Sequence, residues 1–345
     1  MMDLLGFTII VVKVLVVFAA TMLGVLVMIY AERRVSAFMQ DRVGPNRVGP
    51  KGVLQPIADG IKFLMKEDLV PERVDKPIFI LAPAILLIPA LMTFAVIPFG
   101  SPINLFGREI ALQVADVNVG ILYVLALTSI SVYGIVLAGW SSNNKYSLLG
   151  GLRSSAQLIS YELAMGLAVV SIILLAGSLR LNDIITDQQS SFLSWNIFRQ
   201  PLAFLIFLIA VYAETNRLPF DLSEAEQELV GGYHTEYSSM KFAMFFMAEY
   251  ANMITAAALT VTLFFGGWDV PLLDEGSLGL FGALLSVLSF ILKVAFFLFL
   301  FIWVRWTFPR FRYDQLMRLG WKVMLPLALF NIFLTGGYLT IKALG

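Results

Sequence analysis

The sequence predicts an all-α polytopic membrane protein, and three observations support this fold class. Hydrophobic residues make up 59% of the 345 residues and charged residues 14%, whereas soluble domains contain about 25% charged residues. Apolar runs recur along the whole chain, and each is long enough to cross a bilayer as a helix of about 20 residues. Lysine and arginine are concentrated in the connections on one side of these runs. We therefore expect a single integral membrane domain over residues 1–345.

Eight apolar runs are the expected spanning helices. The first is too long for the apolar core of a signal peptide, and Asp3 stands where such a peptide has basic residues, so we expect it to remain as a helix. The second contains three prolines, which favour a kink. The fifth has an uninterrupted apolar stretch only from Pro201 onward. The expected spans cover residues 7–30, 78–99, 118–140, 156–176, 194–213, 240–266, 279–304 and 319–343.

The connection over residues 31–77 contains a predicted amphipathic helix. Two Gly-Pro steps within residues 44–50 favour turns, and the missing Gly-Lys-Ser/Thr ending excludes a nucleotide-binding P-loop. Pro56 suits a first helical position, and apolar residues recur at helical spacing from there to Met65. This pattern predicts a helix on the membrane surface. It is either a simple lipid-surface element or the border of an entrance for an amphiphilic ligand.

The distribution of lysine and arginine predicts the orientation. The connections over residues 31–77 and 214–239 lie on the side that is rich in these residues, which is the cytoplasmic side of a membrane. The expected location is the bacterial cytoplasmic (inner) membrane, or the mitochondrial inner membrane if the gene is organellar. With eight spans, both ends of the chain face the opposite side.

The connection over residues 214–239 is unusually acidic. One interpretation is an ordinary solvated loop. However, apolar and aromatic residues are mixed with the acids, which favours contact with protein or lipid. Crowded, partly desolvated carboxylates have raised pKa values, so such groups can exchange protons near neutral pH. The acids are Glu214, Asp221, Glu224, Glu226, Glu228 and Glu236.

Further charged residues lie within or at the end of the expected spans. Glu162 is in the fourth span, Glu249 in the sixth and Lys293 in the seventh, while Glu32 and Arg33 close the first. A charge at the centre of the bilayer costs at least about 2.5 kcal/mol, so it should face protein or a wet cavity. Each residue alone is compatible with a structural ion pair. Together they favour a proton or ion pathway.

Cofactor chemistry is restricted by the composition. The chain has no cysteine and one histidine, His234, so it offers no thiolate ligands for an iron–sulfur cluster or a structural zinc ion. We expect neither a covalently bound cofactor nor a metal site. The formal net charge is zero, and we expect no nucleic-acid partner.

Three long blocks of the sequence are similar to one known family. They read AERRVSAFMQDRVGPNRVGPKGVLQPIADGIKF, ETNRLPFDLSEAEQELVGGYHTEYSSMKFAMFFMAEY and WVRWTFPRFRYDQLMRLGWK. The chain resembles the membrane-embedded quinone-site subunit of respiratory NADH:quinone oxidoreductase (complex I). The resemblance extends over nearly the whole chain, including helix number and spacing, although residues 100–117 and 178–199 show no signature.

The resemblance implies a quinone substrate, with ubiquinone as the expected type. It implies that the chain helps to form a quinone chamber, that the quinone tail enters between the first helix, the surface helix and the sixth helix, and that carboxylates couple quinone reduction to proton translocation. The implied chamber and entrance residues are Glu32, Arg33, Arg42, Asp59, Phe63, Arg217, Phe220 and Arg305, with Arg153 near the mouth. The implied proton-path residues are Glu162, Glu214, Asp221, Glu224, Glu226, Glu228 and Glu249.

The implied partners are the other subunits of complex I and membrane lipid. These subunits are the peripheral cluster-bearing and quinone-site subunits, small membrane subunits and antiporter-like subunits. Two alternatives remain open: the equivalent subunit of a related membrane-bound hydrogenase, and a stand-alone secondary ion transporter. The second commonly shows an inverted repeat with two broken helices, and the sequence shows no such repeat. A purely structural anchor would leave the intramembrane acids unexplained.

Overall fold

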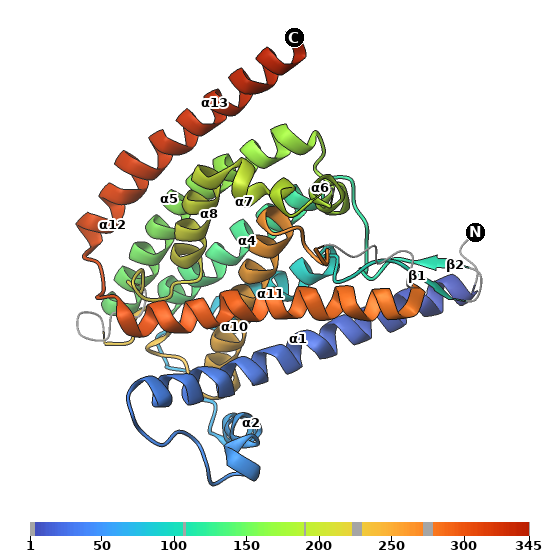
Figure 1. Ribbon diagram of the computed structural model, residues 1–345. Coiled ribbons are helices and arrows are strands. Elements are labelled where there is room, and N and C mark those ends of the chain that lie inside the picture. Colours follow the sequence, from blue (N-terminus) through green and yellow to red (C-terminus); the bar gives the residue numbers. More distant parts are fainter. Residues whose placement is uncertain (1–3, 106–107, 190, 223–229, 272–278, 345) are drawn as a thin grey trace.

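Helices form nearly all of the regular structure (Figure 1). The computed structural model of the protein describes residues 4–105, 108–189, 191–222, 230–271 and 279–344. Within these ranges, seven helices are long and apolar enough to cross a membrane, and an eighth apolar helix, α8 (Pro201–Glu214), is shorter. The protein is therefore an all-α, multi-pass membrane protein, as the sequence predicts.

The helices follow the expected order along the chain. The long helices are α1 (Leu4–Met39), α3 (Lys76–Met92), α4 (Gly120–Ser141), α5 (Lys145–Ala176), α10 (Ser239–Phe264), α11 (Gly279–Thr307), and a final stretch made of α12 (Tyr313–Leu319), a π-helical segment (Gly320–Met324) and α13 (Leu325–Leu344). The short helices are α2 (Gln55–Met65), α6 (Leu181–Gln188) and α7 (Asn196–Arg199). Single 3-10 turns cover Pro50–Gly52, Thr93–Ala95, Phe192–Ser194 and Gly232–His234. Strands β1 (Ile103–Leu105) and β2 (Arg108–Ile110) form a small antiparallel hairpin.

Two helices extend well beyond their expected ends. Helix α1 continues past Tyr30 to Met39, so Glu32 and Arg33 lie within it instead of closing it. Helix α5 begins at Lys145, where the side chain of Asn144 accepts a hydrogen bond from the backbone N–H of Tyr146 and satisfies a free donor of the first turn. Hydropathy detects only the apolar part of a helix, and both extensions are polar in sequence.

The fifth expected span, residues 194–213, is broken. The backbone leaves the helical conformation at Gln200 (φ −137°, ψ 58°), and α8 starts at Pro201. Proline has no N–H and disfavours the helical conformation in the preceding residue. The 14 residues of α8 cover about 21 Å, which is less than the bilayer core of about 30 Å. The polar side chain of Gln200 at the break bonds to Thr335 (2.8 Å) and Asn331 (2.9 Å) of α13.

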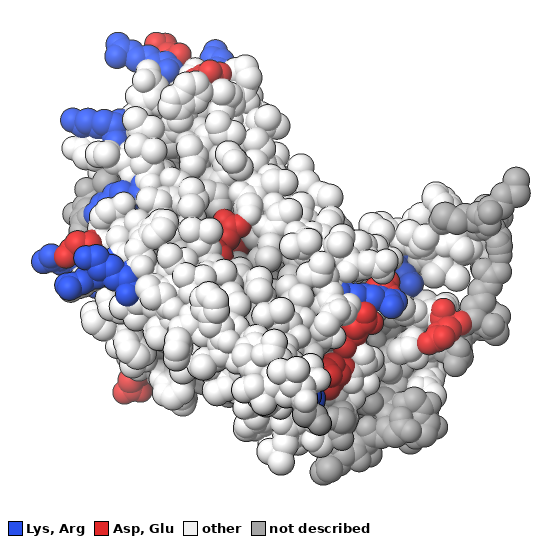
Figure 2. Space-filling model, turned by 90° about the horizontal axis from the view of Figure 1, so that it is seen from above, with Lys and Arg blue, Asp and Glu red and all other residues white. Residues whose placement is uncertain are grey.

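The central helices pack around a common core. Helix α5 packs against α4, α8 and α13, while α10 packs against α3 and α11. The largest fully buried side chains include Tyr161 in α5, Phe207 in α8 and Phe245 in α10. Helices α1 and α11 lie side by side along one flank, and α13 crosses the opposite flank (Figure 1). Figure 2 shows broad uncharged areas that separate a few groups of charged residues, which is typical of a protein embedded in lipid.

The predicted surface helix is present as α2, and polar contacts anchor it to α10. The hydroxyl of Ser239 lies 2.9 Å from the carbonyl oxygen of Phe63 and 3.0 Å from that of Lys66. Both are free acceptors at the C-terminal end of α2, and the hydroxyl hydrogen is shared between them or donated to one of them. Lys241 forms an ion pair with Asp68 at 2.7 Å. Since α2 also packs against α1, the three elements of the expected quinone entrance lie together (Figure 1).

Candidate functional site

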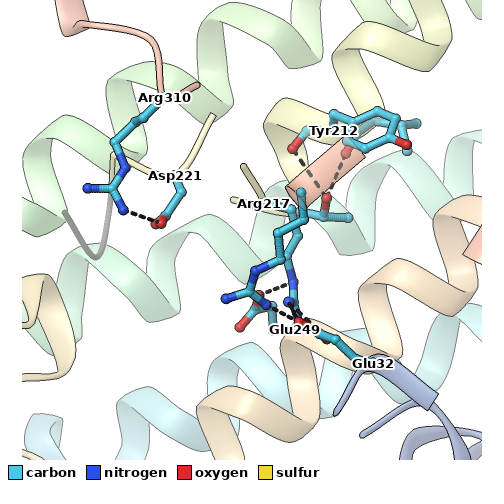
Figure 3. Close-up of polar contacts among 9 residues, drawn as sticks. Glu32, Tyr212, Arg217, Asp221, Glu249 and Arg310 are labelled. Atoms are coloured by element: carbon cyan, nitrogen blue, oxygen red, sulfur yellow. Dashed lines mark hydrogen bonds and ion pairs between the residues drawn. The ribbon is translucent and has the colours of Figure 1, made fainter. Parts of the chain in front are cut away.

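Four elements converge on a buried ion cluster (Figure 3). Arg217, in the segment after α8, contacts both oxygens of Glu32 in α1 at 2.8 and 3.1 Å. Its Nε lies 2.5 Å from Oε1 of Glu249 in α10. Arg305 of α11 forms a further ion pair with Glu32. The ring of Tyr250 lies 4.7 Å from the Arg217 guanidinium, so the aromatic face also stabilises the cation.

The charges of this ion cluster balance. Two carboxylates face two guanidiniums, and Arg217 is only 5% exposed. Burial by itself would lower the pKa of Arg217, but the carboxylates of Glu249 and Glu32 raise it well above its ordinary value. Arg217 therefore stays protonated. Because water is scarce here, any added charge nearby would act strongly on the ion cluster.

A second ion pair fixes the acidic segment to the connection after α11. Asp221 contacts Arg310 at 2.8 Å (Figure 3), and the backbone N–H of Phe311 donates to the carbonyl of Pro219. The buried ring of Phe220 packs edge-on against Tyr161 of α5, with 5.3 Å between ring centroids. These contacts place Asp221 and Phe220 beside the core, not in a solvated loop.

Two interior carboxylates are held by hydroxyl groups instead of arginines. Ser129 of α4 donates to Glu162 of α5. Thr128, the residue before it, lies within hydrogen-bonding reach of Glu214 in α8. Both acids are half-buried, and each has a hydroxyl beside it, as expected for groups whose full exposure to lipid would carry a large energetic cost.

A small cavity connects the ion cluster with this hydroxyl-held region. Glu249 and Glu214 both line it, together with Asn252, Thr128 and Tyr233. The cavity has about 30 Å³ of space for water-sized molecules, enough for at least one water with polar partners. Glu249 and Glu214 thus share one water-sized space. Glu162 does not line it but is close enough to Glu214 to act on it electrostatically, and these three acids with the cavity are called the polar route.

The residues predicted at the entrance are more exposed. Arg33 of α1 pairs with Asp59 of α2 at 2.5 Å, and its side chain is 47% exposed. The ring of Phe63 lies 6.0 Å from that of Phe242 in α10. Arg42 is exposed and donates to Gln40 (2.7 Å), so it does not join the ion cluster. The contacts between α1, α2 and α10 thus border the expected entrance.

The remaining predicted site residues fall into three groups. The Arg153 guanidinium lies 5.5 Å from the centre of the Tyr313 ring. Glu236 accepts a hydrogen bond from Asn144 at 2.6 Å, outside the ion cluster. Glu224, Glu226 and Glu228 lie outside the described residues.

Several residues of the site carry no charge and were not among the residues predicted from the sequence. They are Thr128, Ser129, Tyr250 and Asn252. Asn252 follows Glu249 by three residues, a spacing that puts both on one helix face. Applying this rule to each intramembrane acid would have found Asn252.

The single histidine lies among aromatic rings. The His234 ring stands edge-on to Tyr233 (5.0 Å), Phe242 (5.2 Å) and Phe246 (6.0 Å). Burial lowers the pKa of His234 to about 4, so it is neutral at physiological pH. Within the described ranges, histidine, cysteine, aspartate and glutamate side chains form no group of three or more that could hold a metal ion.

Fold and site together define a polytopic membrane protein with a charge-balanced ion cluster and buried titratable acids. The chain belongs to the NADH dehydrogenase family, whose model matches residues 12–336. It is 57% identical over 335 residues to an H-type subunit of NADH-quinone oxidoreductase from Geobacter sulfurreducens, covering 94% of this chain and 93% of that protein. It is 53% identical over 310 residues to an H-type subunit of the same enzyme from Cytophaga hutchinsonii (89% and 90% covered). It is 54% identical over 337 residues to the H-type subunit from Leptospira biflexa (95% and 94% covered).

Proposed function

We propose that the chain is the corresponding membrane subunit of a proton-translocating NADH:quinone oxidoreductase. In this role it helps to form the quinone chamber and couples quinone reduction to proton movement through its buried acids. The family membership and the relatives' names support the complex. The observation that supports the coupling role is a cavity that Glu249, bound to Arg217 of the ion cluster, lines together with Glu214, with Glu162 near enough to act electrostatically on Glu214.

The chemistry of quinone reduction explains why the polar route is useful. Reduction adds two electrons and requires two protons, so an anionic product must meet counter-charges or proton donors. A nearby negative charge raises the proton affinity of neighbouring carboxylates. The chain's own residues therefore hold charge and move protons, while the electrons come from the cluster-bearing peripheral subunit.

The entrance is proposed to lie between α1, α2 and α10. Ser239 anchors the C-terminal end of α2, and the Arg33–Asp59 pair joins α2 to α1. The outer face of α2 exposes Ile57, Ile61 and Leu64, which suits contact with lipid and with an apolar quinone tail. In this proposal the quinone tail enters from the membrane beside this face of α2.

The coupling role can be tested with Glu214→Gln in the native host. This change keeps the shape of the side chain but removes its proton exchange. We expect a several-fold loss of both NADH:quinone turnover and proton pumping in membrane vesicles, with normal complex content on native gels and normal NADH oxidation by a water-soluble acceptor.

Glu236→Gln is the matched control, because Glu236 pairs with Asn144 outside the polar route. It should behave as wild type. Wild-type turnover and pumping in Glu214→Gln would refute the coupling role.

Copurification of the tagged chain identifies the complex: NADH-oxidising partners support the proposal, partners with a nickel–iron site indicate a hydrogenase, and isolation alone indicates a transporter.

A further inference from the structure

We propose that the Thr128 and Ser129 hydroxyls of α4 are positioning residues that allow Glu214 and Glu162, one at a time, to gain and lose a proton without leaving a hydroxyl donor unpaired. This inference rests on the proposed coupling function. It assigns a role to two uncharged residues that lie beside the acids of the polar route.

The geometry joins two consecutive residues to two carboxyl groups on different helices. Ser129 Oγ donates to Glu162 of α5 and also lies 2.9 Å from the carbonyl oxygen of Leu125. Thr128 Oγ1 lies 2.9 Å from the same carbonyl oxygen. Thr128 also lines the cavity together with Glu214 of α8, where its hydroxyl is placed to donate to this acid. Each hydroxyl thus has two acceptors: one carboxyl group and the shared Leu125 carbonyl.

This arrangement suits both protonation states of each acid. A hydroxyl has one hydrogen to donate, while a carbonyl oxygen has two lone pairs. When Glu214 or Glu162 is ionised, its hydroxyl partner donates to the carboxylate. When the acid is protonated, its own O–H donates to the hydroxyl oxygen, and the hydroxyl hydrogen turns to Leu125. A buried donor without an acceptor would cost about 1–3 kcal/mol. The Leu125 carbonyl already accepts the helical N–H of Ser129, so its second lone pair receives one hydroxyl at a time and removes this cost for one protonated acid.

The contrast with Glu32 shows what the hydroxyls achieve. Glu32 is paired with the guanidiniums of Arg217 and Arg305. Guanidiniums offer donors but no acceptor, so protonating Glu32 would leave buried donors without a charged partner. Hydroxyls both donate and accept. The acids beside Thr128 and Ser129 are therefore the ones whose surroundings permit repeated proton exchange, while Glu32 acts as a fixed counter-charge.

Other charged groups face this pair of acids. Glu162 acts electrostatically on Glu214, and Glu249 lines the same cavity as Glu214. Arg217 is the cation bound to Glu249. A proton on one acid thus affects the others, and the hydroxyls must adapt locally at each step.

The test removes the hydroxyls while keeping shape. Thr128→Val is nearly isosteric, and Thr128→Ser restores the hydroxyl. We expect Thr128→Val and Ser129→Ala each to lose quinone turnover and proton pumping several-fold in vesicles, and Thr128→Ser to retain most of both. Complex content and NADH oxidation by a water-soluble acceptor should stay normal.

Ser142→Ala is the control. Its hydroxyl also donates to a helix carbonyl, that of Ala138 at 2.7 Å, but this bond involves no carboxylate, so we expect wild-type activity. Wild-type turnover in the Thr128→Val/Ser129→Ala double variant would overturn the inference. Equal losses in Thr128→Val and Thr128→Ser would also overturn it, because shape and not the hydroxyl would then matter. If Glu214→Gln leaves turnover and pumping unchanged, the proposed coupling function is refuted. If Glu214→Gln loses activity but the hydroxyl variants do not, only the role of Thr128 and Ser129 is refuted.

Discussion

Buried carboxylates occupy two different environments in this protein. In the ion cluster, Glu32 is held by guanidiniums from distant parts of the chain. In the hydroxyl-held region, Glu162 and Glu214 meet Ser129 and Thr128. Arginine pairs favour the charged form, while hydroxyls serve either form. The comparison teaches that the acids of one chain can differ in role although they look alike in the sequence. Glu249 lies between the two environments, because it is bound to Arg217 and also lines the cavity.

The largest expected effect comes from breaking the ion cluster. Arg217→Gln leaves Glu249 without its ion-pair partner and Glu32 with Arg305 alone, and breaking a buried ion pair costs about 3–5 kcal/mol. We expect little assembled complex on native gels. The double variant Arg217→Gln/Glu249→Gln keeps the charges balanced and should recover part of the assembly. Arg42→Gln, at an exposed site, is the control. Normal assembly of Arg217→Gln alone would show that the ion cluster does not stabilise the fold.

An intermediate effect on stability is expected from the titration of His234, whose imidazole is surrounded by aromatic rings. Its pKa of about 4 lies below the ordinary value of 6.5, so the unfolded chain takes up a proton first as the pH falls. Stability should therefore be lost below about pH 6.5, by about 1.5 kcal/mol between pH 6.5 and 5.

His234→Asn should make thermal unfolding of the detergent-solubilised complex less sensitive to pH in this range. Measuring wild type and variant side by side separates this contribution from those of other groups. Parallel pH dependences in the two proteins would contradict the burial of the imidazole.

The smallest effect on stability is expected at the exposed ion pair between Arg33 and Asp59. Arg33→Lys keeps the charge beside Asp59 but loses the planar fork, and an exposed pair is worth about 0–1 kcal/mol. Assembly should be normal. If Arg33 borders the entrance, the apparent KM for quinones should rise, by less than about fivefold. An unchanged KM for short- and long-tailed quinones would remove Arg33 from the entrance.

Much of the architecture was predictable because lipid imposes simple rules. Apolar length predicts a spanning helix, and an amphipathic period predicts a surface helix such as α2. Helix ends were harder to predict, since the extension of α1 to Met39 and the start of α5 at Lys145 lie in polar sequence. The break at Gln200 was only partly foreseeable from Pro201.

By itself, the sequence determined the class of protein, the approximate spans and the set of acids that cannot face lipid. Only the tertiary structure decided the partner of each acid. Glu32 and Arg33 are neighbours in sequence, yet Glu32 binds Arg217, 185 residues away, while Arg33 binds Asp59. Consecutive side chains on a helix point about 100° apart, so one faces the core and the other the surface helix. Helix packing, not sequence proximity, therefore divides the acids between guanidiniums and hydroxyls.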